Sequence, residues 1–366
     1  MDAPETSEVT GPETEIRQGC SESASRDAAK LAVIITCYNY EAFVERAINS
    51  VLDQKRDDCE LVVVDDGSTD GSWQAIGRCG ARAFRIDNRG QLGACVYGLE
   101  RTQAPFVLFL DADDELKPGS LAALIDELDE RVAKIQFALT LIDADDRPMG
   151  AFSSLDAFRD REGLLDEVLR RGVYKTPPTS GNVFRRDVCE LLREVDYDKA
   201  VDGIILFAAP LFGDVVSLSE ELGYYRVHGR NDSRFGQIPT AGIIERDIDR
   251  FVVRTEHLRR VVQRLAPGRQ LVQCRDAFYY RERKFCLDIV SGHRPRLTAL
   301  PMLLAGLAAE PYSLKVKLAM MAFFVLGSVL PSEAAKTLLA YRSKSGERSA
   351  LGFAREFFRF RAPARR

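Results

Sequence analysis

A buried strand that ends in a cluster of acids is the feature that most constrains this chain. The residues from Pro105 to Leu110 are almost all large and apolar, which favours a strand covered on both faces of a parallel sheet. Asp111, Asp113 and Asp114 follow directly. Open α/β sheets bind ligands beyond the carboxyl ends of their strands, so we expect a ligand site here. Close carboxylates repel each other by roughly 4 kcal/mol per pair at ~4 Å unless a cation lies among them. The run therefore predicts a site for a divalent metal such as Mg²⁺, held with substrate phosphates.

Strands and helices of about ten residues alternate through the part of the chain that precedes this run. Apolar residues recur at helical spacing after the first strand, and glycine-rich turns separate the later elements. This alternation predicts an α/β fold with parallel βαβ units and right-handed crossovers. We expect strands at 31–36, 60–64 and 81–86, and helices at 44–52, from about residue 70, and at 91–101.

Composition narrows the class of protein. With 366 residues, 46% of them hydrophobic, the chain can bury one large core or two moderate ones. A net charge of −4 gives no reason to expect nucleic acid as a partner. The eight cysteines form no CxxC pair and the first residues show no signal-peptide pattern, so we expect a reduced, cytoplasmic protein. Neither HExxH nor GxxxxGK[ST] occurs, which argues against a zinc protease and a P-loop NTPase.

The two ends of the chain differ from its centre. Residues 1–29 contain seven acidic side chains and few large apolar ones, which predicts a disordered tail. In residues 236–366 apolar residues recur at helical spacing, which predicts a helical C-terminal domain. Two uncharged runs within it, 297–309 and 318–332, would form helices of roughly 20 Å, short of the ~30 Å hydrocarbon core of a bilayer. They fit buried helices or a shallow interfacial hairpin.

Positive charge gathers toward the C-terminus. Residues 313–366 carry eleven basic and three acidic side chains, and Phe353, Phe357 and Phe360 recur at helical spacing among arginines. This composition is typical of a segment that lies on an anionic bilayer, which predicts peripheral contact with the membrane, at its cytoplasmic face. An ordinary helical domain with a solvated basic face is the alternative.

A series of short motifs, taken in order, resembles the motifs of a known protein family. In order, the chain reads T-C-Y-N at 36–39, D-D-G-S-T-D-G at 65–71, N-R-G-Q-L-G-A at 88–94, D-A-D-D at 111–114, S-G-N-V-F-R-R at 180–186, D-G at 202–203 and G-Y-Y-R-V-H at 223–228. Over residues 30–235 it resembles family 2 glycosyltransferases of the GT-A fold, a Rossmann-like, mostly parallel mixed sheet. The resemblance implies transfer of a sugar from a nucleoside diphosphate sugar, with UDP favoured, to a glycan or lipid-linked acceptor. It also implies Mg²⁺ or Mn²⁺ as cofactor and inversion at the anomeric carbon.

The resemblance assigns donor contacts to motif positions. Tyr38 would stack on the base, Thr36 would line the same pocket, and Asp66 would accept a hydrogen bond from the base. Arg89 lies where the family contacts the ribose or base. Alternatives remain: Tyr38 could pack between helix and sheet, Asp65 could cap its own turn, and Arg89 could be a solvated charge.

The same resemblance also implies roles for residues around the metal. Asp111 would contact the ribose or metal, Asp113 would bind the metal that bridges both phosphates, and Asp114 would lie behind them. His228 would reach the metal or diphosphate, or else would be a structural histidine. A second D-A-D-D at 143–146, followed by Arg-Pro, is interpreted as a solvated hairpin turn.

An inverting transfer needs a carboxylate that takes the proton from the attacking hydroxyl. Asp202 is the candidate, although Val201 stands where the family often has Glu. Asp198 is a rival, and Asp202 could instead be a helix N-cap. The loop Thr176 to Asn182 is expected on the acceptor side. Two other functions are alternatives: a nucleotidyltransferase, which would need a glycine-rich basic loop after the first strand, and a non-catalytic membrane scaffold that binds the donor.

Overall fold

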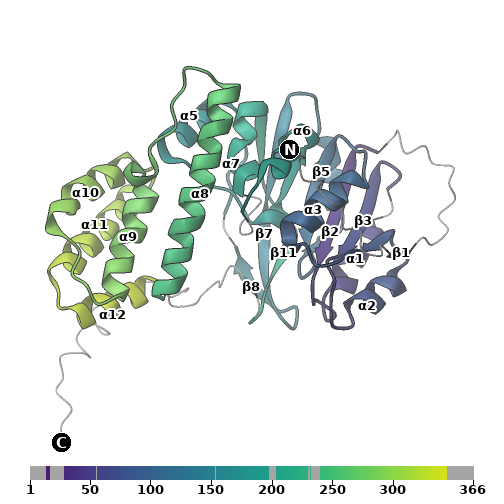
Figure 1. The fold of residues 1–366 in the computed structure, drawn as a ribbon, viewed down its shortest axis with the longest axis horizontal. Helices are drawn as coiled ribbons and strands as arrows, with labels where there is room; N and C mark the ends of the chain where they lie inside the picture. Colours follow the sequence, from purple (N-terminus) through teal and green to yellow (C-terminus); the bar gives the residue numbers. More distant parts are fainter. Residues whose placement is uncertain are drawn as a thin grey trace, which may run out of the picture. The chain divides into compact units, whose positions relative to one another are not determined.

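One mixed sheet forms the framework of the first part of the chain (Figure 1). Strands β4, β3, β2 and β5 run parallel to one another, while β10 enters antiparallel between β5 and β7. The order across the sheet is β1 (Thr14–Ile16), β4 (Ala83–Arg85), β3 (Cys59–Asp65), β2 (Leu31–Cys37), β5 (Phe106–Asp111), β10 (Asn182–Arg185), β7 (Val132–Asp143), β11 (Asp214–Val227) and β6 (Glu115–Leu116). The strands β8 (Pro148–Ala151) and β9 (Phe158–Asp160) pair with β7 and β11. The predicted α/β sheet is confirmed.

This computed structural model describes residues 14–16, 29–54, 56–152, 154–197, 203–229, 231 and 240–343. They divide into two compact units. The sheet unit comprises residues up to Asp166 together with Tyr174–His228, and the helical unit comprises Glu167–Val173 and the residues from Gly229 onward. The boundary predicted at residue 235 falls outside the described residues, and the segment 167–173 joins the helical unit.

Helices cover the buried strands of the sheet unit. Every residue from Leu31 to Ile35 is completely buried, which accounts for the continuous apolar run of β2. Gly98 allows close packing of helix on strand, because a Cβ there would lie 2.4 Å from Cγ2 of Ile34. The helices are α1 (Val44–Leu52), α2 (Ser72–Cys79), α3 (Gly90–Glu100), α4 (Ser120–Asp126), α5 (Glu162–Arg171), α6 (Arg186–Cys189) and α7 (Gly203–Phe212).

The predicted disordered tail is wrong for three residues. Thr14–Ile16 form β1 and pair antiparallel with β4. Without β1, β4 would be the edge strand of the sheet. The backbone N–H and C=O groups of such an edge can pair even with a short segment from an acidic tail. The rest of the predicted tail lies outside the described residues, apart from Ala29.

The helical unit contains α8 (Ala241–Leu265), α9 (Phe278–Val290), α10 (Leu300–Ala309), α11 (Leu314–Val329) and α12 (Ser332–Ser343). Edge-to-face contacts among Phe278, Phe285, Phe323 and Phe324 form the centre of its core. In the part of the chain that the structure describes, we find no helix with the length and apolar character needed to cross a membrane. The segment with Phe353, Phe357 and Phe360 lies outside the described residues.

Candidate functional site

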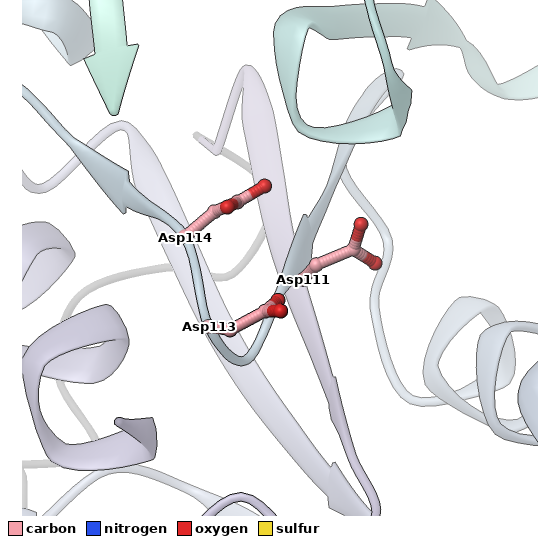
Figure 2. Close-up of side chains that lie close together, drawn as sticks. All are labelled: Asp111, Asp113 and Asp114. Carbon is pink, nitrogen blue, oxygen red and sulfur yellow. The ribbon is translucent and has the colours of Figure 1, made fainter. Parts of the chain in front are cut away.

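The acid cluster lies at the carboxyl end of β5, in the middle of the sheet. Asp111 is the last residue of β5, and a tight turn, in which the Asp114 amide donates to the Asp111 carbonyl at 3.0 Å, leads to β6. Asp111, Asp113 and Asp114 each offer a carboxylate oxygen, and these oxygens lie within 4.8 Å of one another. Figure 2 shows the three side chains extending toward the same side of this turn. The sequence prediction of clustered carboxylates at this strand end is therefore met by the geometry.

The donor set fits a hard divalent cation. Burial raises the pKa of Asp114 well above its usual range, and the charges of Asp113 and Asp111 raise it further. Among the described residues, Oδ2 of Asp114 is buried and accepts no hydrogen bond. Buried, mutually repelling carboxylate oxygens are what a Mg²⁺ or Mn²⁺ ion neutralises. Asp111 and Asp113, the two predicted ligands, are more accessible than Asp114.

His228 lies beside this cluster, at the end of β11. Its Nε2 is 2.8 Å from Oδ2 of Asp113. The imidazole stacks on Phe43, with ring centroids 5.1 Å apart, and meets the edge of Tyr40 at 5.9 Å. The aromatic rings and the carboxylate fix the position of the histidine, so the strand-end motif of residues 223–228 and the D-A-D-D motif form one site.

Arg226 fixes the backbone of the acidic turn through hydrogen bonds and ion pairs. Its side chain is completely buried, its Nε donates to the Asp113 carbonyl at 3.0 Å, and its backbone amide donates to Oδ1 of Asp114 at 2.9 Å. The guanidinium also pairs with Glu115 and Asp146 and lies 5.1 Å from the centroid of the Phe43 ring. Such a buried, many-partnered arginine fixes the backbone that presents the carboxylates.

The second D-A-D-D motif forms the predicted exposed hairpin turn, and it also makes a contact that the sequence did not indicate. Residues 143–146 do form the turn between β7 and β8, and Asp146 has a left-handed φ of 66°. However, Asp146 pairs with the buried Arg226, and it also accepts from Arg46 of α1 at 2.6 Å. The sequence pattern misses this pairing because residues 46, 146 and 226 are brought together only by the fold.

The predicted donor residues line the neighbouring strand ends. The register places Thr36 beside Asp111 and Cys37 beside Asp65, so the carboxyl ends of β2, β3 and β5 meet at one edge. Tyr38 follows β2, and 45% of its surface is exposed, so packing between helix and sheet is wrong for this ring. The exposed ring is available for stacking.

Two adjacent acids, Asp65 at the end of β3 and Asp66 directly after it, have different environments. The Asp66 Oδ1 accepts from the Arg89 amide at 2.7 Å, and burial raises the pKa of Asp66 to about 6, against a lowering by the amides of Arg89 and Gly90. Asp65 is completely buried, lies 3.2 Å from Nε of Arg85, and burial raises its pKa. Asp65 is thus a structural ion-pair partner, while the Arg89 side chain is exposed beside Asp66.

A set of hydrogen bonds joins the loops after β2 and β3. Asn39, with a left-handed φ of 62°, accepts from the amides of Thr69 at 2.8 Å and Asp70 at 3.3 Å. The Asn39 amide donates to the hydroxyl of Ser68, and the Tyr40 amide donates to the hydroxyl of Ser72. The sequence analysis gave Asn39 no role, although an asparagine that follows a strand is among the residues that adopt this conformation.

The predicted acceptor-side loop, Thr176 to Asn182, is held by hydrogen bonds within the loop and by a hydrogen bond from β7. The Asn182 amide group donates to the Pro178 carbonyl at 2.6 Å, and the buried Lys134 donates to Thr176 at 2.6 Å. The buried Ser180 hydroxyl accepts from the Asp111 amide at 3.1 Å, so this loop borders the acid cluster. Sequence reasoning assigned no role to Lys134, and it named Ser180 only as part of this loop and of the motif at 180–186. The predicted base Asp202 and its rival Asp198 lie outside the described residues.

Comparison with known proteins agrees with this geometry. The family model described as glycosyl transferase family 2 matches residues 32–190. The chain is 37% identical over 215 residues to an uncharacterized glycosyltransferase of Nostoc sp., which covers 56% of this chain and 66% of that protein. It is 31% identical over 140 residues to GalNAc(5)-diNAcBac-PP-undecaprenol beta-1,3-glucosyltransferase of Campylobacter jejuni, covering 36% of this chain and 45% of that protein.

A solved structure shares the fold. Residues 1–349 of TarS from S. aureus align with a TM-score of 0.50 and 19% identity, over 86% of this chain and 91% of that one. The chain spans about two thirds or less of the length of the two relatives above. From the matching motifs, the family model and the shared fold, residues 32–190 match glycosyl transferase family 2, and the sheet unit has the GT-A fold.

Proposed function

We propose that this chain is an inverting, divalent-metal-dependent glycosyltransferase that moves a sugar from a nucleoside diphosphate sugar to a hydroxyl group. The favoured donor is a UDP-sugar, and the reaction would serve the assembly of cell-surface polysaccharide or glycolipid at the cytoplasmic face of the membrane. The observation that carries the proposal is the cluster of Asp111, Asp113 and Asp114 at the carboxyl end of β5, with His228 at 2.8 Å from Asp113.

The donor would bind across the ends of β2, β3 and β5. Tyr38 would stack on the base, Asp66 would accept from its N–H, and Thr36 and Arg89 would border the base and ribose. The exposure of Tyr38 and the burial of Asp66 beside the Arg89 amide support this arrangement. An ionised carboxylate is the stronger acceptor for the N–H of the base, and with a pKa of about 6 Asp66 is mostly ionised near neutral pH.

The diphosphate would lie over the acid cluster. Asp111 and Asp113 would hold the Mg²⁺ or Mn²⁺ ion, which when bound neutralises the charge that develops on the leaving nucleoside diphosphate. Asp113 would be kept in place by His228 and by the Arg226 contact to its carbonyl.

The acceptor hydroxyl would approach from the face of the sugar opposite the diphosphate, and a carboxylate would take its proton. We assign this role to Asp202, which directly precedes α7, with Asp198 as the alternative. The Campylobacter relative is named for an acceptor on undecaprenyl diphosphate, which supports a lipid-linked acceptor here as well.

The test is thermal stabilisation of the purified chain by a panel of nucleoside diphosphates and nucleotide sugars, each with and without Mn²⁺. A shift given by one nucleotide, and only with metal, is the expected result and identifies the donor class. The absence of any shift across the panel would contradict the donor site. A shift without sugar transfer to any hydroxyl acceptor would instead favour a donor-binding scaffold.

A further inference from the structure

Helix α11 of the helical unit has apolar residues on two sides. Met320, Phe323 and Phe324 are buried in the core of the unit. The opposite side is also apolar, and its large residues recur along the helix at i, i+4, i+7, i+11 and i+15, where they are between 39% and 73% exposed: Leu314, Leu318, Met321, Val325 and Val329. A surface helix normally presents charged or polar residues on its outer side, so this face calls for a partner.

Helix α10 precedes α11 and shows the same property. The two helices pack against each other, and the Lys317 ammonium donates to the Ala308 carbonyl at 2.6 Å. Met302 of α10 and Leu297 of the short 3-10 turn before it are more than half exposed, and the other exposed residues of α10 are Pro301 and alanines. With ten and sixteen residues, the helices are too short to cross a bilayer but can lie along its surface.

The exposed charges between Ser291 and Leu330 have one sign, while Glu333 at the start of α12 is exposed and pairs with Lys336. From Ser291 to Leu330, the basic side chains are Arg294, Arg296, Lys315 and Lys317, and all but Lys317 are exposed. The single acid in this stretch, Glu310, is 5% exposed and pairs with Arg171 of the same unit. The exposed charges of this stretch are therefore cationic, although the whole chain has a net charge of −4.

We propose that the α10–α11 hairpin is the surface by which this protein docks on an anionic lipid bilayer. The exposed apolar residues would enter the boundary between headgroups and acyl chains, and the cations would contact anionic headgroups. A protein partner, including a second copy, is less consistent with this surface, because the polar rims of protein interfaces carry both signs of charge. The hairpin would be the surface that makes the membrane contact included in the proposed function. Binding of the hairpin to a bilayer would not depend on sugar transfer.

Sedimentation of the full chain with lipid vesicles tests the proposal. One vesicle preparation is phosphatidylcholine alone, and the other contains phosphatidylglycerol as about one third of the lipid. The wild-type chain is expected to bind the anionic vesicles about tenfold or more tightly than the neutral ones, since several cations contribute, and added salt should reduce this difference.

Two sets of variants separate the apolar and cationic contributions. Leu318→Ser with Val325→Ser should weaken binding to anionic vesicles by about tenfold or more. The matched control is Val253→Ser with Leu265→Ser, two apolar residues of α8 with comparable exposure, which should bind as wild type does. Arg294→Glu, Arg296→Glu and Lys315→Glu together should abolish the preference for anionic lipid, whereas Arg269→Glu should not. Unchanged melting temperatures confirm that the variants fold.

Three outcomes would overturn the proposal. The first is equal binding of the wild-type chain to both vesicle types or to neither. In the second, the Leu318→Ser and Val325→Ser variant binds as wild type does, while serine at Phe353, Phe357 and Phe360 abolishes binding, which would assign membrane contact to that segment. In the third, the wild-type chain forms a dimer that the serine variant of α11 dissolves, which would assign the face to a second copy.

Discussion

Asp113 and Asp145 hold the same place in two copies of the D-A-D-D sequence, yet their surroundings differ. Asp113 is buried beside Asp111, Asp114 and His228, whereas the Asp145 side chain is 70% exposed and pairs with Arg147 at 3.4 Å. We predict that Asp113→Ala abolishes the Mn²⁺-dependent thermal shift given by the nucleotide donor, because the ion loses a ligand.

Asp145→Ala is the matched control for this substitution. It removes an equal carboxylate from the same tetrapeptide and should leave the thermal shift unchanged, since surface substitutions rarely exceed about 0.5 kcal/mol. Donor stabilisation equal to wild type in Asp113→Ala, with Mn²⁺ present, would show that the ion is held elsewhere.

Gly67 and Gly90 allow a second matched comparison at this scale. Both have a left-handed φ, of 73° and 74°. A Cβ on Gly67 would lie 2.9 Å from the Asn88 amide nitrogen, while one on Gly90 would meet nothing within 4 Å. We predict that Gly90→Ala costs about 1 kcal/mol of unfolding free energy through backbone strain alone.

Gly67→Ala should cost more, about 2–3 kcal/mol, because steric displacement of the Asn88 backbone adds to the strain. Since Arg89 donates its amide to Asp66, this variant should also weaken donor binding, and Gly90→Ala should weaken it less. Chemical denaturation and nucleotide titration measure the two effects. Equal losses in both variants would mean that the contact at Asn88 does not matter.

The proposed base gives a third prediction for a single residue. Asp202→Asn keeps the size of the side chain but cannot accept a proton in the reaction, so donor and Mn²⁺ binding should persist while transfer falls by about two to four orders of magnitude. Asp198→Asn is the control. Release of nucleoside diphosphate from the donor, measured with acceptor-bearing membranes, follows transfer. Activity lost in Asp198→Asn and kept in Asp202→Asn would exchange the two roles.

Strand-end residues were predictable because a buried strand and the turn after it lie within a few residues of each other. The position of Asp111 and Asp113 at a strand end could be predicted in this way, whereas Asp66 was assigned through the family resemblance. The roles of Ser180 and Arg226 could not be predicted, since they depend on contacts to residues 69 and 113 positions away. A sequence pattern carries no information on which distant backbone group a serine or an arginine will meet.

At the scale of elements, the hairpin of β7 and β8 supports the acidic turn from outside. Its Asp146 accepts from Arg226, which in turn holds the backbone of Asp113 and the side chain of Asp114. We predict that Asp146→Asn lowers the unfolding free energy by about 1–3 kcal/mol, the range for a hydrogen bond to a charged group. It should also raise the Mn²⁺ concentration that gives half of the maximal donor-dependent thermal shift.

Asp145→Asn, one residue earlier in the same hairpin, is again the control and should change neither quantity. If Asp146→Asn destabilised the fold but left the Mn²⁺ requirement unaltered, the hairpin would be a structural support without influence on the metal site.

Elements that pair with near neighbours were also predicted better than those that pair across the sheet. The parallel strands and the first three helices of the sheet unit occur within two or three residues of their expected limits. The antiparallel entry of β10 between β5 and β7 could not be predicted, because the order of strands depends on long-range pairing. Within the predicted helical domain, α9 begins at Phe278, after a short 3-10 turn at Cys274–Asp276.

For the whole molecule, Asp66 links nucleotide recognition to stability. Its pKa in the folded state, about 6, lies above the usual value, so the native state binds this proton more tightly than the unfolded state does. The contribution of Asp66 to the unfolding free energy is therefore largest at low pH and is lost as the pH rises from about 4 to about 6.

We accordingly predict that Asp66→Asn stabilises the nucleotide-free protein by about 1–2 kcal/mol near neutral pH. The gain should shrink toward about pH 3, where most of the wild-type carboxyl is protonated in both states. Denaturation at the two pH values measures this, and nucleotide titration should show weakened donor binding. A variant less stable than wild type at neutral pH would contradict the sign.

The limits of the two units were less accessible from sequence than their folds. Residues 167–173 belong with the helical unit, where Arg171 pairs with Glu310 and the Leu169 carbonyl accepts from the Val272 amide at 2.7 Å. The first crossing, between residues 166 and 167, gives no compositional break because it lies inside a regular helix, α5.

The hydrogen bonds that Asn39 makes to the loop after β3 have a consequence for the energetics of binding. Two loops that would otherwise have to be ordered by the nucleotide are already joined in its absence. The conformational entropy of these residues is thus lost on folding rather than on binding. Donor association should therefore have a small entropic penalty from the protein, and the affinity should reflect the contacts of the base, the ribose and the diphosphate themselves.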